Sequence, residues 1–98
     1  MAKLRHVVLL SFKASATPDE VQAVEWAFTR LETQVEEVDM LEWGTNISPE
    51  QHNQGFTHCF LLTFSSEADR DAYLTHPDHV AFGELLRPRL EKVCVVDY

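Results

Sequence analysis

Four short segments of the chain are rich in apolar residues and bounded by polar stretches, a pattern that predicts β-strands. These segments cover residues 4–12, 38–45, 56–64 and 93–98. Side chains of a strand point to its two faces in turn, so each segment divides into two sets. The third segment is the clearest, because one of its faces carries Phe56, His58, Phe60, Leu62 and Phe64.

Residues 17–36 instead repeat apolar side chains at three- and four-residue steps, which is typical of an amphipathic helix. Thr17, Pro18 and Glu20 give this helix a capping box with proline at its first position. Its apolar stripe consists of Val21, Val24, Phe28, Leu31 and Val35. Trp26 falls nearly opposite the stripe, where it is either a surface residue or a contact with another chain.

Two shorter helices follow the third strand. Ser66 and the early acidic residues after it predict a helix start. That helix must end before Pro77, because the residue preceding a proline resists the α conformation. His76 is therefore expected to be a helix stop, and Pro77 to begin a short helix that reaches about Leu86.

The order of elements is thus β-α-β-β-α-(α)-β. It predicts an α+β, ferredoxin-like βαββαβ fold, with helices on one face of a four-stranded antiparallel sheet. Residues 1–98 are expected to form a single domain, and the chain shows no internal repeat or linker.

The other face of the predicted sheet stays apolar once the helices cover the first. Val7, Leu9, Cys59 and Leu61 lie on it. Monomers avoid large contiguous apolar patches, so we expect two copies to pack sheet against sheet as a twofold homodimer.

The composition of the chain indicates which classes of binding partner to expect and where in the cell the protein is located. The formal charge of −8 disfavours nucleic acid and acidic membrane surfaces. The N-terminal segment lacks the pattern of a signal peptide and no segment is apolar enough to span a bilayer, so we expect a cytoplasmic protein. Cys59 and Cys94 lie in apolar runs, where buried thiols are expected, although a disulfide remains an alternative.

Residues 71–83 concentrate side chains that handle protons. Tyr73 and His79 should lie over the helix-facing side of the sheet, toward which His6 and His58 also point. We expect a mostly apolar cavity between sheet and helices, where these groups converge. For His6 and His58, a hydrogen-bonded place in the core is the alternative.

The chemistry expected of this group is acid/base catalysis. His79 lies near the start of a helix, whose dipole favours the neutral imidazole that a general base requires. Tyr73 could donate a hydrogen bond to a substrate carbonyl and stabilise an enolate. The spacing of His76 and His79 resembles a metal-ligand pair, but Pro77 intervenes and no ligand cluster supports it, so we expect no metal and no cofactor.

These residues belong to motifs that resemble a known family. The motifs are His6-Val7-Val8-Leu9, Gly55-Phe56-Thr57-His58, Tyr73-Leu74-Thr75-His76-Pro77-Asp78-His79-Val80-Ala81-Phe82 and Val96-Asp97-Tyr98. Together they look like the stress-responsive dimeric α/β-barrel (Dabb) domain, over essentially the whole chain. The resemblance implies a ferredoxin-like subunit whose homodimer forms a barrel.

The resemblance also implies site residues. In a plant polyketide-cyclising enzyme of the family, residues matching His79 and Tyr73 are the catalytic pair of a cofactor-free aldol closure. The implied substrate-binding residues are His6, His58, Phe28 and Phe82. Phe28 stands where that enzyme has a tyrosine, which puts the substrate in question.

Two hypotheses follow from the residues and the resemblance together. In the first, the protein is a cofactor-independent, cyclase-like catalyst for a small carbonyl or polyketide-like ligand. In the second, it is a non-catalytic stress or ligand-binding protein that uses the same fold. The residue set fits both hypotheses.

Overall fold

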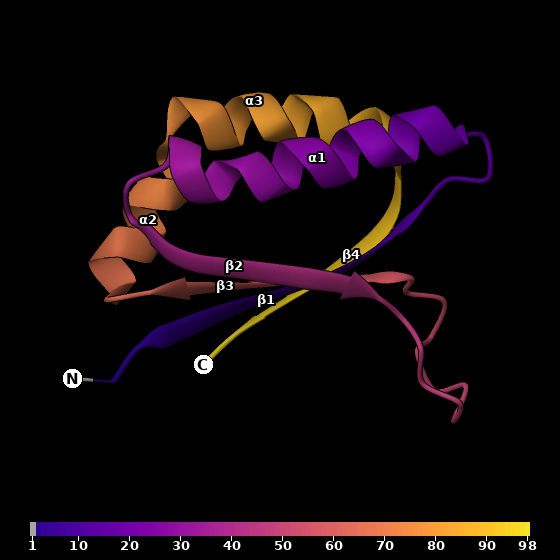
Figure 1. The fold of residues 1–98 in the computed structure, drawn as a ribbon, viewed down its shortest axis with the longest axis horizontal. Coiled ribbons are helices and arrows are strands. Elements are labelled where there is room, and N and C mark those ends of the chain that lie inside the picture. The colour runs from indigo at the N-terminus through magenta and orange to yellow at the C-terminus, as the bar shows by residue number, and fades with distance from the viewer. Residues whose placement is uncertain (1) are drawn as a thin grey trace.

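A four-stranded antiparallel sheet with helices on one of its faces forms the body of the protein (Figure 1). The computed structural model describes residues 2–98. Its elements are β1 (Leu4–Phe12), α1 (Pro18–Gln34), β2 (Val38–Thr45), β3 (His58–Phe64), α2 (Glu67–Thr75), α3 (Pro77–Leu86), the 3-10 helix η1 (Arg87–Arg89) and β4 (Leu90–Asp97). The strand order β2-β3-β1-β4 confirms the predicted ferredoxin-like α+β fold.

The start of α1 is fixed by the predicted capping box. The Thr17 hydroxyl accepts the Glu20 N–H at 3.2 Å, and the Glu20 carboxylate accepts the Thr17 N–H at 2.9 Å. The helix ends at Gln34, two residues earlier than the sequence pattern suggested. Val35 already has extended backbone angles (φ −112°, ψ 111°), while its N–H still bonds to the Leu31 carbonyl.

The core lies between the helices and the inner face of the sheet. In the centre of this layer the Phe28 and Phe60 rings are stacked, with centroids 4.0 Å apart. Val8 of β1 pairs with Phe60 on one side and with Val95 on the other, so these three residues share the helix-facing side. Other residues of this core are Leu10, Val24, Leu31, Val35, Leu62, Phe64 and Tyr73.

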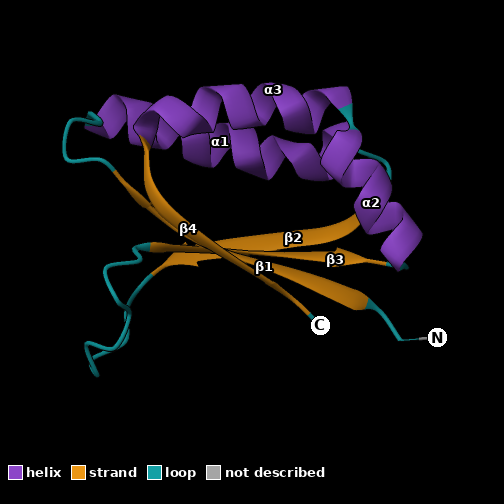
Figure 2. Cartoon of the chain, turned by 180° about the vertical axis from the view of Figure 1, so that it is seen from behind, coloured by secondary structure: helices purple, strands orange, loops and turns teal. Residues whose placement is uncertain are grey.

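Two strand boundaries differ from the sequence prediction. β3 begins at His58 rather than Phe56, because Gly55 has φ 84° and the Phe56 N–H bonds back to the Asn53 carbonyl in a turn. β4 begins at Leu90 rather than at residue 93, since Leu90 already pairs with β1 across a register irregularity. The connection of residues 46–57 extends beyond the sheet on the side away from the helices (Figure 2).

The outer face of the sheet, opposite the helices, carries both cysteines. They flank Leu9 in one row, because Leu9 pairs with Cys59 on β3 and with Cys94 on β4. Cys59 is exposed and Cys94 half-buried, so the expectation of two buried thiols is wrong for the single chain. Among residues 2–98 no helix covers this face, and only the turn that holds Asn53 and Phe56 borders it at one end, so the thiols reach solvent.

Among the helices of residues 2–98, none combines the length and the apolar character that crossing a lipid bilayer requires.

Candidate functional site

A cleft of about 460 Å³ opens between β4 and the pair of helices α2 and α3. Its apolar wall is formed by Val8, Phe28, Phe82, Leu86, Val93 and Val95. Its polar side is formed by His6, Arg70, Tyr73, His79 and Asp97, together with Asp71 at α2. The cleft therefore joins a mostly apolar wall to a compact group of hydrogen-bonding side chains.

The junction of α2 and α3 brings Tyr73 and His79 together. Their ring centroids lie 4.4 Å apart. His76 ends α2 in an extended conformation and caps α3, since its Nδ1 accepts the Asp78 N–H at 3.1 Å. The prediction of His76 as a helix stop is confirmed. Asp78 lies beside His76, with its carboxylate 3.9 Å from Nδ1.

The hydrogen bonding of His79 suits a neutral base. Its Nδ1 lies 3.0 Å from the Leu74 carbonyl oxygen, which can only accept, so Nδ1 carries the proton and Nε2 keeps its lone pair in the neutral ring. Burial lowers the pKa of His79, more than the hydrogen bond to Leu74 raises it, and the nearby His6 and His76 lower it further. The sequence predicted this direction, but burial and not the helix dipole is its leading cause.

Tyr73 has the opposite electrostatic character. Its side chain is 1% exposed, and this burial raises the pKa of its hydroxyl, so it remains a protonated hydrogen-bond donor at neutral pH. Within residues 2–98, every fully buried side-chain N or O atom has a hydrogen-bond partner. The Tyr73 hydroxyl makes no hydrogen bond to those residues, so it is not fully enclosed, and Tyr73 is one of the residues that line the cleft.

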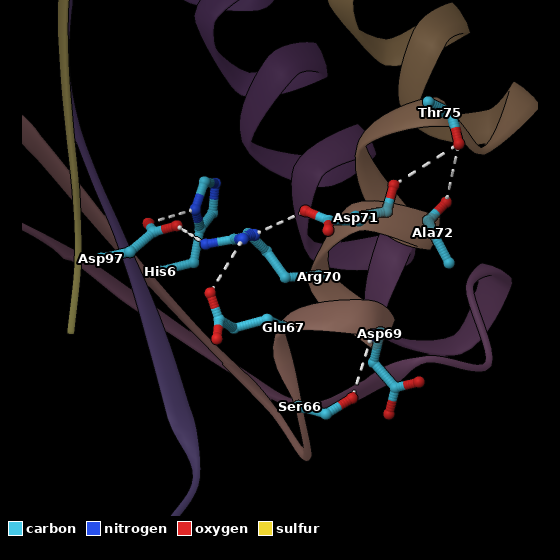
Figure 3. Close-up of polar contacts among 9 residues, drawn as sticks. All are labelled: His6, Ser66, Glu67, Asp69, Arg70, Asp71, Ala72, Thr75 and Asp97. Atoms are coloured by element: carbon cyan, nitrogen blue, oxygen red, sulfur yellow. Dashed lines mark hydrogen bonds and ion pairs between the residues drawn. The ribbon is translucent and has the colours of Figure 1, made fainter.

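His6 is anchored by Asp97, which Arg70 holds in turn (Figure 3), and the sequence alone did not single out either residue as functional. The Asp97 carboxylate accepts from His6 Nδ1 at 2.7 Å and from Arg70 at 2.9 Å. Partial burial alone would raise the pKa of Asp97, but the bonds from Arg70 and His6 outweigh it and lower the pKa. The His6 ring lies 6.0 Å from the Tyr73 ring.

The signal for Asp97 was present in the sequence but needed the sheet register to interpret. Asp97 is part of the C-terminal motif Val96-Asp97-Tyr98, and β1 pairs His6 directly with Asp97. Arg70 had no such signal, because it reaches Asp97 from a helix 27 residues away.

His58 does not join the cleft, contrary to the expectation of one cavity shared with His79 and Tyr73. It pairs with Leu10, four residues along β1 from His6, which corresponds to roughly 13 Å along the strand. His58 Nε2 instead lies 2.7 Å from Glu25 of α1, and the Phe12 ring packs against its imidazole at 5.0 Å.

The two aromatic residues expected at the site do lie at the cleft. Phe28 and Phe82 both line it, and their ring centroids are 4.5 Å apart. His76 and His79 use their Nδ1 atoms within the protein. In the part of the chain that the structure describes, no three His, Cys, Asp or Glu side chains gather as a metal site would require.

Comparison with known proteins identifies the family to which the chain is similar. Residues 4–98 match the family model described as the stress responsive A/B barrel domain. The chain is 35% identical to the stress-response A/B barrel domain-containing protein HS1 of Arabidopsis thaliana, over 97% of this chain and 87% of that protein. It is 27% identical to olivetolic acid cyclase of Cannabis sativa, over 97% of this chain and 94% of the cyclase.

Solved structures show the same fold. A hydroxynitrile lyase from Passiflora edulis superimposes with a TM-score of 0.92 at 28% identity, over 98% of this chain and 91% of the lyase. A dimeric ferredoxin-like protein of unknown function from Thermobifida fusca gives a TM-score of 0.84 at 25% identity, over 98% of this chain and 89% of that protein.

Proposed function

The chain belongs to the stress-responsive A/B barrel domain family, and we propose that it is a single-domain, cofactor-free acid/base catalyst for a small carbonyl substrate held in the cleft between sheet and helices. The observation that carries this proposal is the contact between the rings of His79 and Tyr73, whose centroids lie 4.4 Å apart in the cleft. The two groups have pKa values pushed apart by their surroundings, as acid/base partners need.

The proposed reaction begins at a carbon next to a carbonyl group. His79 Nε2 takes the proton from that carbon, the C–H electron pair moves into the enolate, and the Tyr73 hydroxyl donates a hydrogen bond to the enolate oxygen. If a second carbonyl lies within reach, the enolate carbon attacks it, and the new alkoxide takes back the proton that His79 Nε2 removed in the first step. A polyketide-like chain carries both carbonyls, so an aldol ring closure needs no further reactant.

The shape of the cleft supports a small and partly apolar substrate. Its volume of about 460 Å³ falls within the range of small-molecule sites. The wall that includes Phe28 and Phe82 suits an alkyl or aryl part, while His6, held by Asp97, is placed to bind a polar group. Phe28 has no hydroxyl, so this wall favours an apolar substituent. Two of the similar proteins bear the names of enzymes, a cyclase and a hydroxynitrile lyase.

The alternative is a stress or ligand-binding protein in which the cleft holds a molecule without converting it. The name of the relative HS1 from Arabidopsis, a stress-response protein, favours this alternative. The alternative uses the same cleft, and it differs from the first proposal only in turnover.

The proposed assembly is a homodimer through the outer face of the sheet. That face carries half-buried Val7, Leu9 and Leu61 with exposed Val96, and similar solved structures are described as dimeric. Packing two such faces together removes the apolar surface from water.

Exchange of carbon-bound protons tests the catalytic proposal without knowledge of the natural substrate. A medium-chain methyl ketone is incubated with the protein in heavy water, and deuterium uptake next to the carbonyl is followed by NMR. We expect the intact protein to accelerate uptake, and His79→Gln to reduce the acceleration by about 100-fold or more. Tyr73→Phe should reduce it less, because the base remains.

The matched control is His52→Gln, which removes an exposed loop histidine far from the cleft. This variant should accelerate deuterium uptake by the ketone as much as the intact protein does. Equal rates in the His79→Gln variant would overturn the catalytic proposal. Saturable chemical-shift changes at the cleft without any exchange would favour the ligand-binding alternative.

A further inference from the structure

A second concavity lies away from the cleft, at the edge of the sheet formed by β2. It is an open groove of about 660 Å³ between the outward side of α1 and Trp43. The residues that line it include Asp19, Gln22, Glu25, Trp26, Thr29 and Trp43. Neither Tyr73 nor His79 takes part, so the groove is separate from the proposed catalytic site.

Two indole rings line this groove. Trp26 is 68% exposed and Trp43 is 39% exposed, although large aromatic side chains gain most when they are buried. Trp43 is held in place, because its ring is nearly parallel to the rings of His58 at 6.0 Å and Phe60 at 5.2 Å. The groove therefore presents one fixed aromatic wall and one exposed indole without any other chain element covering them.

The charge of the groove is negative. Asp19 and Glu25 line it, and no lysine or arginine is present among its described lining residues. The helix N-terminus partly offsets the charge of Asp19, which lies in the first turn of α1. Glu25 lies farther along the helix, beyond that influence, so its carboxylate is the main negative group beside the indoles.

The Glu25 carboxylate is oriented by the histidine that the cleft does not use. His58 Nε2 donates to Oε2 of Glu25 at 2.7 Å, and the Thr57 hydroxyl lies 2.7 Å from His58 Nδ1. An ionised carboxylate can only accept, so His58 Nε2 carries the proton of this hydrogen bond. Within residues 2–98, Oε1 of Glu25 makes no hydrogen bond and remains available for a ligand.

We propose that this groove binds a small organic ammonium ion, with the indoles of Trp26 and Trp43 against the cation and Glu25 as its counter-charge. Aromatic faces attract organic cations through the ring quadrupole, and a carboxylate adds direct attraction. The formal charge of −8 for the whole chain favours the approach of a cation. The groove volume is that of a small-molecule site, so the occupant is a free ammonium compound.

Choline is a suitable probe, because 3,3-dimethylbutan-1-ol has the same shape without the charge. The indole N–H signals of Trp26 and Trp43 are followed by NMR while either compound is added at constant ionic strength. We expect saturable shifts of both signals with choline, and at least several-fold weaker binding of the neutral alcohol.

Variants separate the two parts of the site. Trp26→Ala removes an exposed ring and should weaken choline binding about twofold to fivefold, which corresponds to an exposed cation–π contact. Glu25→Gln keeps a hydrogen-bond acceptor for His58 and should weaken choline binding about twofold or more. The control Glu84→Gln removes one exposed charge from α3 and should leave binding unchanged.

Three results would overturn the proposal. One is equal binding of choline and its neutral isostere, which would indicate an apolar groove. Another is an equal loss of binding in Glu84→Gln, which would indicate only the overall charge of the protein. The third is a shift that grows linearly without saturation. None of these results bears on the exchange reaction of the cleft.

Discussion

At the scale of single residues, the cleft holds an uncharged phenol, Tyr73, next to an uncharged imidazole, His79. Burial acts on both Tyr73 and His79, but it disfavours the charged form of each, so the phenol keeps its proton and the imidazole loses its own. Asp97 shows the opposite balance, because bonds from Arg70 and His6 outweigh burial and favour its charged form.

The first prediction concerns the pKa of His79. Its imidazole signals, assigned by comparison with His79→Gln, should titrate below the ordinary value of 6.5 in an NMR experiment. The unfolded chain then binds more protons than the folded protein between the two pKa values, so stability falls as the pH drops through that window. In His79→Gln, the part of this pH-dependent loss of stability that comes from His79 should be absent. A midpoint at or above 6.5 would contradict the assignment of His79 as a neutral base.

The second prediction concerns Asp97. The folded pKa of Asp97 is lowered, so its contribution to stability is present above the unfolded pKa and is lost as the pH falls through the folded one. Asp97→Asn should lower the free energy of unfolding near neutral pH by about 1–3 kcal/mol, because buried His6 loses its charged partner. Urea denaturation measures this loss.

The control for Asp97 is Asp71→Asn, since Asp71 also contacts Arg70 but is exposed. It should cost clearly less stability than Asp97→Asn. If both variants were equally stable, the anchoring of His6 by Asp97 would have no energetic weight.

At this scale, the sequence predicted that Tyr73 and His79 lie together, but not which residues hold the neighbouring His6 in place. Tyr73 and His79 are close in the chain, so local helix signals and a known motif place them together. Asp97 and Arg70 meet through sheet register and helix packing, which a single sequence does not reveal. The position of His58, on the right face but at the other end of the strand, also depended on register.

At the scale of elements, the turn between α2 and α3 positions the proposed catalytic pair, Tyr73 and His79. His76 has an extended backbone and its ring accepts the Asp78 N–H, so one residue both ends α2 and caps α3. Pro77 then fixes the first turn of α3, which is the helix that carries His79.

The third prediction concerns this cap. His76→Ala should lower the free energy of unfolding by about 1 kcal/mol, because the first turn of α3 loses a hydrogen-bond acceptor. His76→Ser restores an acceptor and should recover most of the loss in a urea titration. Equal destabilisation by alanine and serine would show that the ring contributes through packing rather than through capping.

Element boundaries were predictable where a local signal marks them and not elsewhere. Capping residues and prolines marked the starts of the three α-helices of residues 2–98. The start of β3 depended on the positive φ of Gly55, and the start of β4 depended on pairing between Leu90 and β1. Such pairing is a long-range property. Because Glu91 and Lys92 are charged, the sequence pattern placed the start of β4 after them, at residue 93.

At the scale of the whole molecule, two layers leave one face of the sheet uncovered. Alternation in β1 was enough to predict which residues face the helices and which face outward. The exposed thiol of Cys59 and the apolar side chains of Val7 and Leu9 share the outer face. A partner copy on that face would bury all of them.

The fourth prediction concerns this assembly. Light scattering coupled to size-exclusion chromatography should show a dimer for the intact protein and a monomer for Leu9→Glu, which places a charge at the centre of the outer face. Val80→Glu adds the same charge to an exposed position of α3 and should remain dimeric.

Thiol chemistry provides a second measurement of the same interface. Cys59 should react with a thiol reagent more slowly in the intact protein than in the Leu9→Glu variant, because a dimer shields the outer face. A monomeric intact protein, or equal rates in the two proteins, would contradict the proposed interface.

The central claim is that neutral His79 removes a proton next to a carbonyl group in the cleft. The most direct measurement is the pH dependence of deuterium uptake by the ketone, set beside the NMR titration of His79 in the same protein. We predict that uptake rises with pH along the deprotonation of His79, with the same midpoint below 6.5, and that His79→Gln abolishes the rise. Uptake with a midpoint unrelated to His79, or unchanged in the variant, would contradict the claim.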